Sequence, residues 1–112
     1  MSYSNPPKGG ITIPVKVQID ITTQADAYAA TRPWSEEYQL QIRFKSKFCY
    51  LDAAKKNEDT FPLGRLCYFG PNKWSLAFYT YSNERYEPCI FPNGNWFGTL
   101  EESIAVCELY LI

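Results

Sequence analysis

The segment Leu63–Phe91, which reads LGRLCYFGPNKWSLAFYTYSNERYEPCIF, sets the architecture expected for this chain. Aromatic and aliphatic residues are concentrated in three runs, at residues 63–69, 73–81 and 84–91. Aromatic and β-branched residues favour strands, whereas the Gly-Pro-Asn and Ser-Asn sequences between the runs favour turns. The segment therefore predicts three consecutive antiparallel strands.

The second turn fixes which side chains share a face of the sheet. A two-residue turn at Ser82-Asn83 pairs strand residues as Tyr79 with Tyr86, Leu76 with Cys89 and Trp74 with Phe91. One face then carries the apolar set Trp74, Leu76, Phe78, Cys89 and Phe91, which is expected to be core. The other face carries Ala77, Tyr79, Tyr81, Glu84 and Tyr86.

This tyrosine face has two interpretations. Tyrosine has an apolar ring and a polar tip, so it is favoured at interfaces. An N-terminal helix that covers the rings is one interpretation, and an exposed binding surface is the other. For the exposed surface, the candidate binding residues are Tyr79, Tyr81, Tyr86, Arg65 and Glu87. Arg65, in the neighbouring strand, is either a surface charge or an anion ligand that projects into this face.

Residues 40–50 predict a further hairpin, because Leu40, Ile42 and Phe44 alternate with polar residues. A three-residue loop at residues 45–47 is preferred, which pairs Phe44 with Phe48. Basic residues outnumber acidic ones in this region, which has one acid, Asp52, and five basic residues: Arg43, Lys45, Lys47, Lys55 and Lys56. Such charges could contact phosphates, but a solvated strand face is the preferred interpretation.

The N-terminal region leaves two structures open. Apolar residues occupy odd positions from Ile11 to Ile21, which predicts a strand, and Pro14 would confine that strand to an edge. A helix over residues 22–32 would follow and stop before Pro33. The alternative is one helix over residues 14–31, with Val17, Ile21, Ala25 and Tyr28 on a single stripe.

Residues 99–112 give the clearest helix signal. Thr99 and Glu102 have the spacing of a capping box, and the expected buried stripe is Leu100, Ile104, Cys107 and Leu111. The predicted fold class is α+β: an antiparallel sheet of four to five strands, with an N-terminal helix and a capped C-terminal helix packed on it. Residues 1–10 are expected to be a flexible tail, and residues 11–112 a single domain.

Composition narrows the chemistry. The 112 residues include no histidine and carry a net charge of −1, so nucleic-acid and anionic-membrane binding are not expected. Cys49, Cys67, Cys89 and Cys107 form no C-x-x-C pair, which argues against zinc. No metal, cofactor or disulfide is expected. The N-terminus lacks a signal-peptide pattern, so reduced thiols and a cytoplasmic location are predicted.

Several motifs resemble a family of short bacterial proteins of about 110 residues. They are PLGRLCYFGPNKWSLAFYTYSNERYEP, then PNG, GTLEES and LYL, with AYAATR and IRFKSKFCYLDA upstream. The similarity extends over about residues 25–111 and leaves out residues 11–24. The family is uncharacterised, so the resemblance implies a free-standing soluble bacterial domain and assigns no activity, cofactor or site residue.

These features favour a small cytoplasmic, non-catalytic interaction or ligand-binding domain that uses an aromatic sheet face. The alternative is a small enzyme or nuclease-like effector that uses Arg65, Tyr86 and Glu87 without histidine or metal. A homodimer is a further expectation. Because both predicted edge strands, Ile11–Ile21 and Glu84–Phe91, contain proline, dimerisation would be face to face through Tyr79 and Tyr86.

Overall fold

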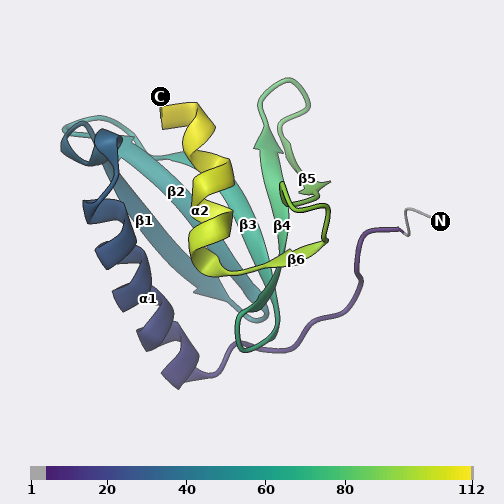
Figure 1. Ribbon diagram of the computed structural model, residues 1–112. Helices are drawn as coiled ribbons and strands as arrows, with labels where there is room; N and C mark the ends of the chain where they lie inside the picture. The colour runs from purple at the N-terminus through teal and green to yellow at the C-terminus, as the bar shows by residue number, and fades with distance from the viewer. Residues whose placement is uncertain (1–4, 112) are drawn as a thin grey trace.

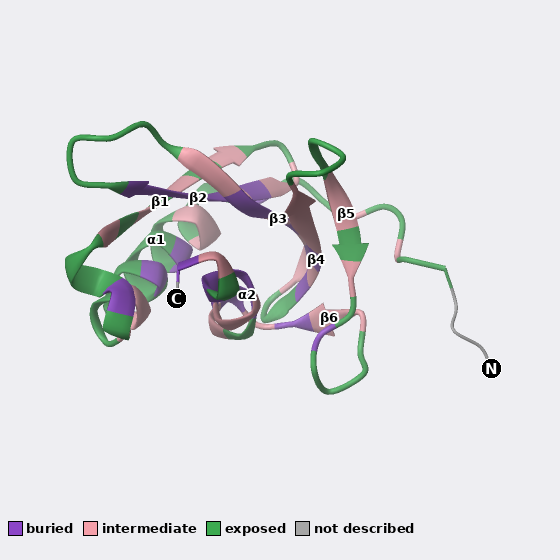
Figure 2. Cartoon of the chain, turned by 90° about the horizontal axis from the view of Figure 1, so that it is seen from above, coloured by how far each residue is buried: buried purple, intermediate pink, exposed green. Residues whose placement is uncertain are grey.

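The computed structural model describes residues 5–111, which form an antiparallel sheet with two α-helices on one of its faces (Figures 1 and 2). The predicted α+β class, with a helix near each end of the chain, is confirmed. The elements in chain order are α1 (Val15–Ala30), the 3-10 helix η1 (Pro33–Glu36), β1 (Tyr38–Lys45), β2 (Phe48–Lys55), β3 (Phe61–Gly70), β4 (Lys73–Thr80), β5 (Arg85–Cys89), β6 (Phe97–Gly98), α2 (Leu100–Cys107) and the 3-10 helix η2 (Glu108–Leu111).

The sheet is a meander in which each strand pairs with the next, in the order β1-β2-β3-β4-β5. Strand β6 lies beside the first half of β4, where Gly98 opposes Trp74. The predicted pairing of Trp74 with Phe91 is therefore wrong, because β5 ends at Cys89 and leaves this edge of β4 to β6. Pro88 lies in the edge strand β5, as its missing N–H predicts.

The strand predicted for Ile11–Ile21 is wrong, and the alternative helix is correct. Pro14 is the N-cap of α1, and the helix ends at Ala30 before Pro33. Ile21 and Ala25 are buried, whereas Val15 and Ile19 are exposed. The residues that pack on the core thus have helical spacing, and the alternation at odd positions has no structural counterpart. The edge opposite β5 is therefore β1, which contains no proline.

The C-terminal helix matches its prediction closely. Thr99 is the N-cap of α2: its hydroxyl accepts a hydrogen bond from the Glu102 amide, and the Glu102 carboxylate accepts one from the Thr99 amide. This is the capping box that the spacing predicts. All four residues of the predicted stripe, Leu100, Ile104, Cys107 and Leu111, are buried.

The β1–β2 hairpin has a tighter turn than predicted. Lys45 pairs with Phe48 across a two-residue turn, in which Ser46 has a positive φ of 57°. The three-residue loop is wrong by one residue of register, and the consequence is large, because one step exchanges the two faces of a strand. Phe44 opposes Cys49 on the helix side, and Arg43 opposes Tyr50 on the other side.

The β4–β5 register is as predicted, with Tyr79 opposite Tyr86 and Leu76 opposite Cys89. The connection itself is longer than a two-residue turn, since β4 ends at Thr80 and β5 begins at Arg85. Glu84 has a positive φ of 52°, and Tyr81 lies within this turn. The pattern of apolar and tyrosine positions was sufficient to place the strands, but not to define the loop between them.

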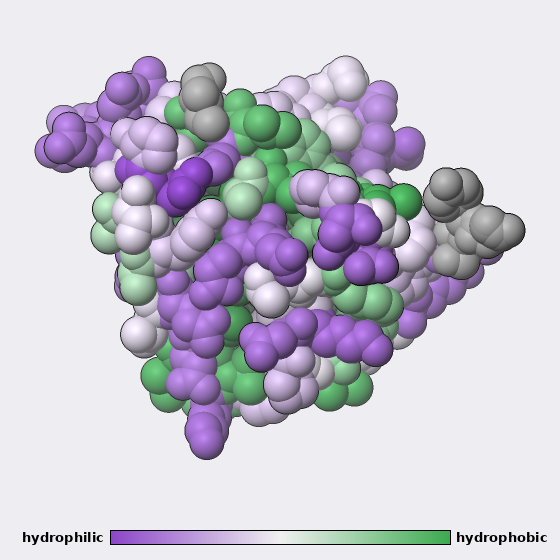
Figure 3. All heavy atoms as spheres, in the orientation of Figure 1, coloured by the Kyte–Doolittle hydropathy of each residue, from purple (hydrophilic) through white to green (hydrophobic). Residues whose placement is uncertain are grey.

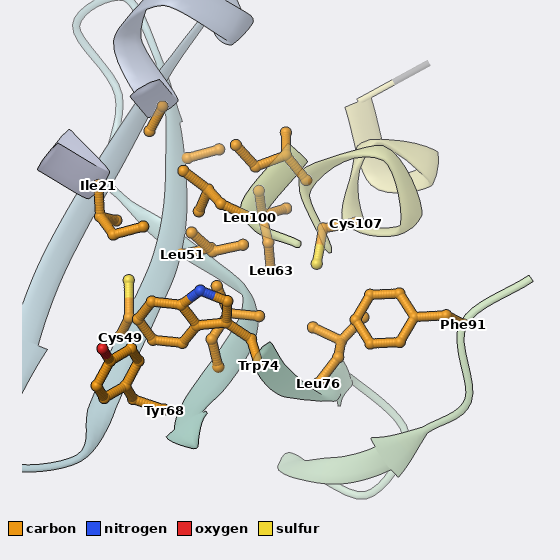
Figure 4. Close-up of a cluster of buried hydrophobic side chains, with 14 of the residues drawn as sticks. Ile21, Cys49, Leu51, Leu63, Tyr68, Trp74, Leu76, Phe91, Leu100 and Cys107 are labelled. Atoms are coloured by element: carbon orange, nitrogen blue, oxygen red, sulfur yellow. The ribbon is translucent and has the colours of Figure 1, made fainter. Parts of the chain in front are cut away.

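The core lies between the helices and the sheet. Trp74 is central to it, and Phe91 reaches in beside Leu76 from the segment after β5 (Figure 4). Gly64 lies where a Cβ would stand 2.8 Å from Cys107 Sγ, so a side chain there would collide with α2. Figure 3 shows the helix-covered side of the molecule, where hydrophilic side chains cover much of the surface.

An ion pair on this side joins the segment after α1 to the end of α2. The Arg32 guanidinium donates two hydrogen bonds to Glu108, at 2.9 and 2.8 Å, and Trp34 Nε1 donates a third at 2.8 Å. Burial raises the pKa of Glu108, but the bonds from Arg32 and Trp34 outweigh burial, so its pKa lies below the usual value. The carboxylate is therefore charged at neutral pH.

Candidate functional site: the open face of the sheet

No helix among the described residues packs on the second face of the sheet, as the view along the sheet shows (Figure 2). We call this surface the open face. The interpretation in which an N-terminal helix covers the tyrosines is wrong, because α1 packs beside α2 on the other side. By strand alternation, the open face carries Arg43, Lys45, Phe48, Tyr50, Asp52, Arg65, Cys67, Ser75, Ala77, Tyr79, Tyr86 and Pro88.

An aromatic cluster occupies the middle of this face. Tyr86 is its centre, with the Tyr79 ring 5.1 Å away and the Tyr50 ring 5.7 Å away, both edge to face. Phe48 extends the cluster along β2, 6.2 Å from Tyr50. All four side chains are half-buried, so the rings support one another and still reach solvent.

Two arginines lie on these rings. The Arg65 guanidinium carbon is 4.3 Å from the centre of the Phe48 ring and 5.2 Å from that of Tyr86. The Arg43 guanidinium carbon is 4.4 Å from the Tyr50 ring. Such cation–π contacts hold a flexible side chain in place without neutralising it. The face therefore presents fixed positive charge over aromatic surface.

The two arginines differ in their partners. Arg43 Nε donates to Asp52 Oδ2 at 2.7 Å, and Asp52 is buried at the far end of the tyrosine cluster. Arg65 forms no ion pair within residues 5–111. Its donors therefore remain available to a ligand.

A hollow of about 330 Å³ adjoins Arg65 at the other end of the open face. Its outer wall is the N-terminal segment from Pro6 to Gly9, which runs past the lower end of the sheet before α1 (Figure 1). Backbone hydrogen bonds from Ile11 to Tyr68 and from Ile13 to Ser46 anchor this segment. Of the predicted tail, residues 1–4 lie outside the described residues, and Pro6 to Gly9 form this wall.

The hollow is lined by cations and aromatic rings. Lys8, Lys47 and Arg65 line it together with Phe48 and Trp96, and no described carboxylate does. On the strands of the open face, Asp52 is the only acid, and Arg43 already pairs with it. Although the whole chain has a net charge of −1, five of its eleven basic residues lie on or beside this face: Lys8, Arg43, Lys45, Lys47 and Arg65.

The predicted binding residues separate into three groups. Tyr79, Tyr86 and Arg65 lie together on the open face. Tyr81 lies at its end, where its ring contacts Tyr79 and its hydroxyl donates to the Pro62 carbonyl at 2.6 Å. Glu87 points to the opposite side and accepts hydrogen bonds from Thr80, Asn83 and Arg85. The geometry therefore does not bring Arg65, Tyr86 and Glu87 together.

The sequence interpretation did not include Phe48, Tyr50 and Arg43 among the binding residues. The charges of this hairpin are evident from the sequence, but the predicted three-residue loop pairs Tyr50 with Ile42 and so places it on the apolar side with Phe44. The signal that would have found them is the register itself: with Lys45 opposite Phe48, the aromatic and basic residues of β1 and β2 fall on one face.

Three groups on or beside the open face have raised pKa values, which makes them unsuited to proton transfer near pH 7. Burial, followed by the nearby Asp52 charge, raises the pKa of Tyr86, and burial raises the pKa of Tyr81 to about 12. Burial also raises the pKa of the Cys67 thiol. These groups stay protonated at neutral pH and serve as hydrogen-bond donors or contact surface.

The part of the chain that the structure describes has no cluster of three cysteine, aspartate or glutamate side chains arranged to hold a metal ion. All four cysteines are free thiols. In residues 5–111 no helix has both the length and the hydropathy needed to cross a bilayer.

Comparison with protein-family models, with curated proteins and with solved structures found no match. The resemblance to a family of short bacterial proteins therefore stays a prediction.

Proposed function

We propose that this chain is a small, non-catalytic binding domain that takes an anionic ligand on the open face of its sheet. The observation that carries the proposal is the position of Arg65, which lies over Phe48 and Tyr86 beside a hollow lined by cations. An arginine held over rings, with no carboxylate partner in the described chain, is preorganised for an anion.

The same charges argue against the face-to-face homodimer predicted from the tyrosines. Pairing two copies through Tyr79 and Tyr86 would bring together the Arg65 side chains of both copies, which have no ion-pair partner within residues 5–111. Like charges at the core of an interface are costly, and interface cores exclude most of them. An anionic partner satisfies these groups better than a second copy does.

The alternative function, a small enzyme, retains one supporting observation: Asp52 is a buried carboxylate near the tyrosine cluster. Arg43 holds that carboxylate as an ion pair at 2.7 Å, which favours a role in positioning Arg43. A catalytic role would need a second group poised for proton transfer, and the raised pKa values of Tyr81 and Tyr86 do not supply one near neutral pH.

We place the domain in the bacterial cytoplasm. Four free thiols, two of them deeply buried, suit a reducing compartment, and the resemblance described above supports the bacterial origin.

Mapping of amide chemical shifts by NMR tests the proposed function. The ¹⁵N-labelled protein is titrated in turn with inorganic phosphate, an acidic peptide, a nucleotide, an oligonucleotide, a neutral sugar and a neutral aromatic compound. We expect the anions to shift amides of β2, β3 and β4 around Phe48, Arg65 and Ala77. Shifts confined to the apolar hollow formed by Ile90, Val106 and Leu109, or no shift with any anion, would contradict the proposal.

A further inference from the structure

We propose that the anionic ligand is single-stranded nucleic acid, with phosphates at Arg65, Lys47 and Lys8 and bases against the aromatic cluster. This inference rests on the proposed function and names its ligand. It departs from the expectation based on net charge. That expectation counted charges over the whole chain, whereas a strand of nucleic acid would contact only the open face.

The basic residues that line the hollow are placed to bind phosphates. Lys8, from the N-terminal segment, lines it together with Lys47 and Arg65, and all three are cations. Phosphate contacts supply most of the affinity for nucleic acid and need such a track of basic residues. No carboxylate among the described lining residues pairs with these cations, so a phosphate would not have to compete with one.

The aromatic rings and the guanidinium groups that contact them are placed to stack with bases. Single-stranded bases stack on aromatic side chains and on arginine planes, because every base has a π-face. Phe48, Tyr50 and Tyr86 are half-exposed, and the guanidinium carbons of Arg43 and Arg65 lie 4.4 and 4.3 Å from the centres of the Tyr50 and Phe48 rings, where a base could stack on them. Trp96 adds a further ring at the hollow.

The dimensions favour a single strand over a duplex. From β2 to β5 the face crosses three steps between strands, about 14 Å at roughly 4.8 Å each. That length has room for about two or three unstacked bases beside the phosphate track. A duplex hides its base faces inside the stack, so it would use the cations and leave the rings without partners.

Fluorescence anisotropy tests the inference directly. A labelled oligothymidylate of about twelve nucleotides is titrated with the full chain at low salt. We expect a Kd in the micromolar range, and weaker binding by the corresponding duplex and by free thymidine monophosphate. The affinity should fall with salt, and Arg65→Gln should reduce the slope of log K against log salt by about 0.7 for the phosphate that is lost.

Two variants separate stacking from charge. Phe48→Leu keeps an apolar side chain and removes the ring, so we expect binding to weaken by about tenfold with the salt slope unchanged. Lys16→Gln is the matched control, because Lys16 is exposed on α1 and its loss changes the net charge by the same amount as that of Arg65. The control should bind as the wild type does, and urea unfolding should show every variant folded.

Three results would overturn the inference: no binding of the oligonucleotide below millimolar concentration, equal weakening by Lys16→Gln and Arg65→Gln, or tighter binding of a polyglutamate peptide of the same charge. The proposed function fails separately. If the oligonucleotide does not bind while other anions shift the open-face amides, only the nucleic-acid inference is lost. Shifts outside the open face would reject both.

Discussion

The two faces of the sheet are built from the same strands but differ in burial, because helices cover only one of them. On the helix side, Cys49, Leu51 and Leu66 are fully buried, and helices supply the matching apolar surface. On the open face, Tyr50 lies between Cys49 and Leu51 in β2, and Arg65 lies next to Leu66 in β3. Tyr50 and Arg65 oppose each other across the two strands, and both are half-exposed. Because side chains alternate, a single strand can contribute to stability with one set of residues and to binding with the other.

The largest expected difference between the faces is in stability. Trp74→Ala removes a fully buried indole from the core and should lower the free energy of unfolding by about 4 kcal/mol. Tyr50→Ala, on the open face, should cost about 1 kcal/mol, because its ring is only partly removed from water. Urea denaturation measures both. Equal losses of unfolding free energy in the two variants would mean that the open face contributes as much to stability as the helix side does.

The ion pair of Arg32 with Glu108 should give a smaller, pH-dependent effect on the helix side. The folded-state pKa of Glu108 is depressed, so the pair stabilises the fold above the unfolded-state pKa of about 4.3 and loses its contribution as pH falls through the folded pKa. Glu108→Gln should cost about 2 kcal/mol at pH 7, since Arg32 remains partly exposed.

The gap in unfolding free energy between wild type and Glu108→Gln should close as pH is lowered below about 4. The exposed Glu58 provides the control, since Glu58→Gln should leave the unfolding free energy nearly unchanged at both pH values. A gap that stayed constant across the acid range would show that Glu108 contributes through packing and not through its charge.

The smallest stability effect is expected on the open face itself. Arg65→Gln should change the unfolding free energy by about 0.5 kcal/mol, because the side chain loses two cation–π contacts and no ion pair within the described chain. Thermal or urea unfolding measures the change. A loss above about 2 kcal/mol would indicate that Arg65 has a structural role, and would weaken the case that it is held ready for a ligand.

The sequence predicted those elements whose signals are local. The capping box at Thr99 and Glu102 needs residues only three apart, and the Tyr79–Tyr86 pairing follows from a short turn. The helix at Val15–Ala30 was ambiguous because Val15, Val17, Ile19 and Ile21 also alternate. Only the tertiary packing of Ile21 and Ala25 against the core decides between helix and strand.

The candidate site was harder to predict because it joins segments far apart in the sequence. Phe48 on β2, Arg65 on β3 and Tyr86 on β5 meet only when the register of three hairpins is correct. One residue of error at Ser46-Lys47 moved Tyr50 to the wrong face. The wall that Lys8 contributes depends on where the N-terminal segment crosses the sheet, for which the sequence has no local signal.

Hydroxyl-radical footprinting of the free protein tests most directly whether one face is covered and the other open. Oxidation read by mass spectrometry should be rapid at Tyr50, Tyr79 and Tyr86, and slow at Tyr68 and Trp74, which are 3% and 1% exposed. The rates should not change with protein concentration if, as we propose, the open face binds an anionic ligand and not a second copy. Protection of Tyr79 and Tyr86 equal to that of Trp74 would contradict the open face and the function built on it.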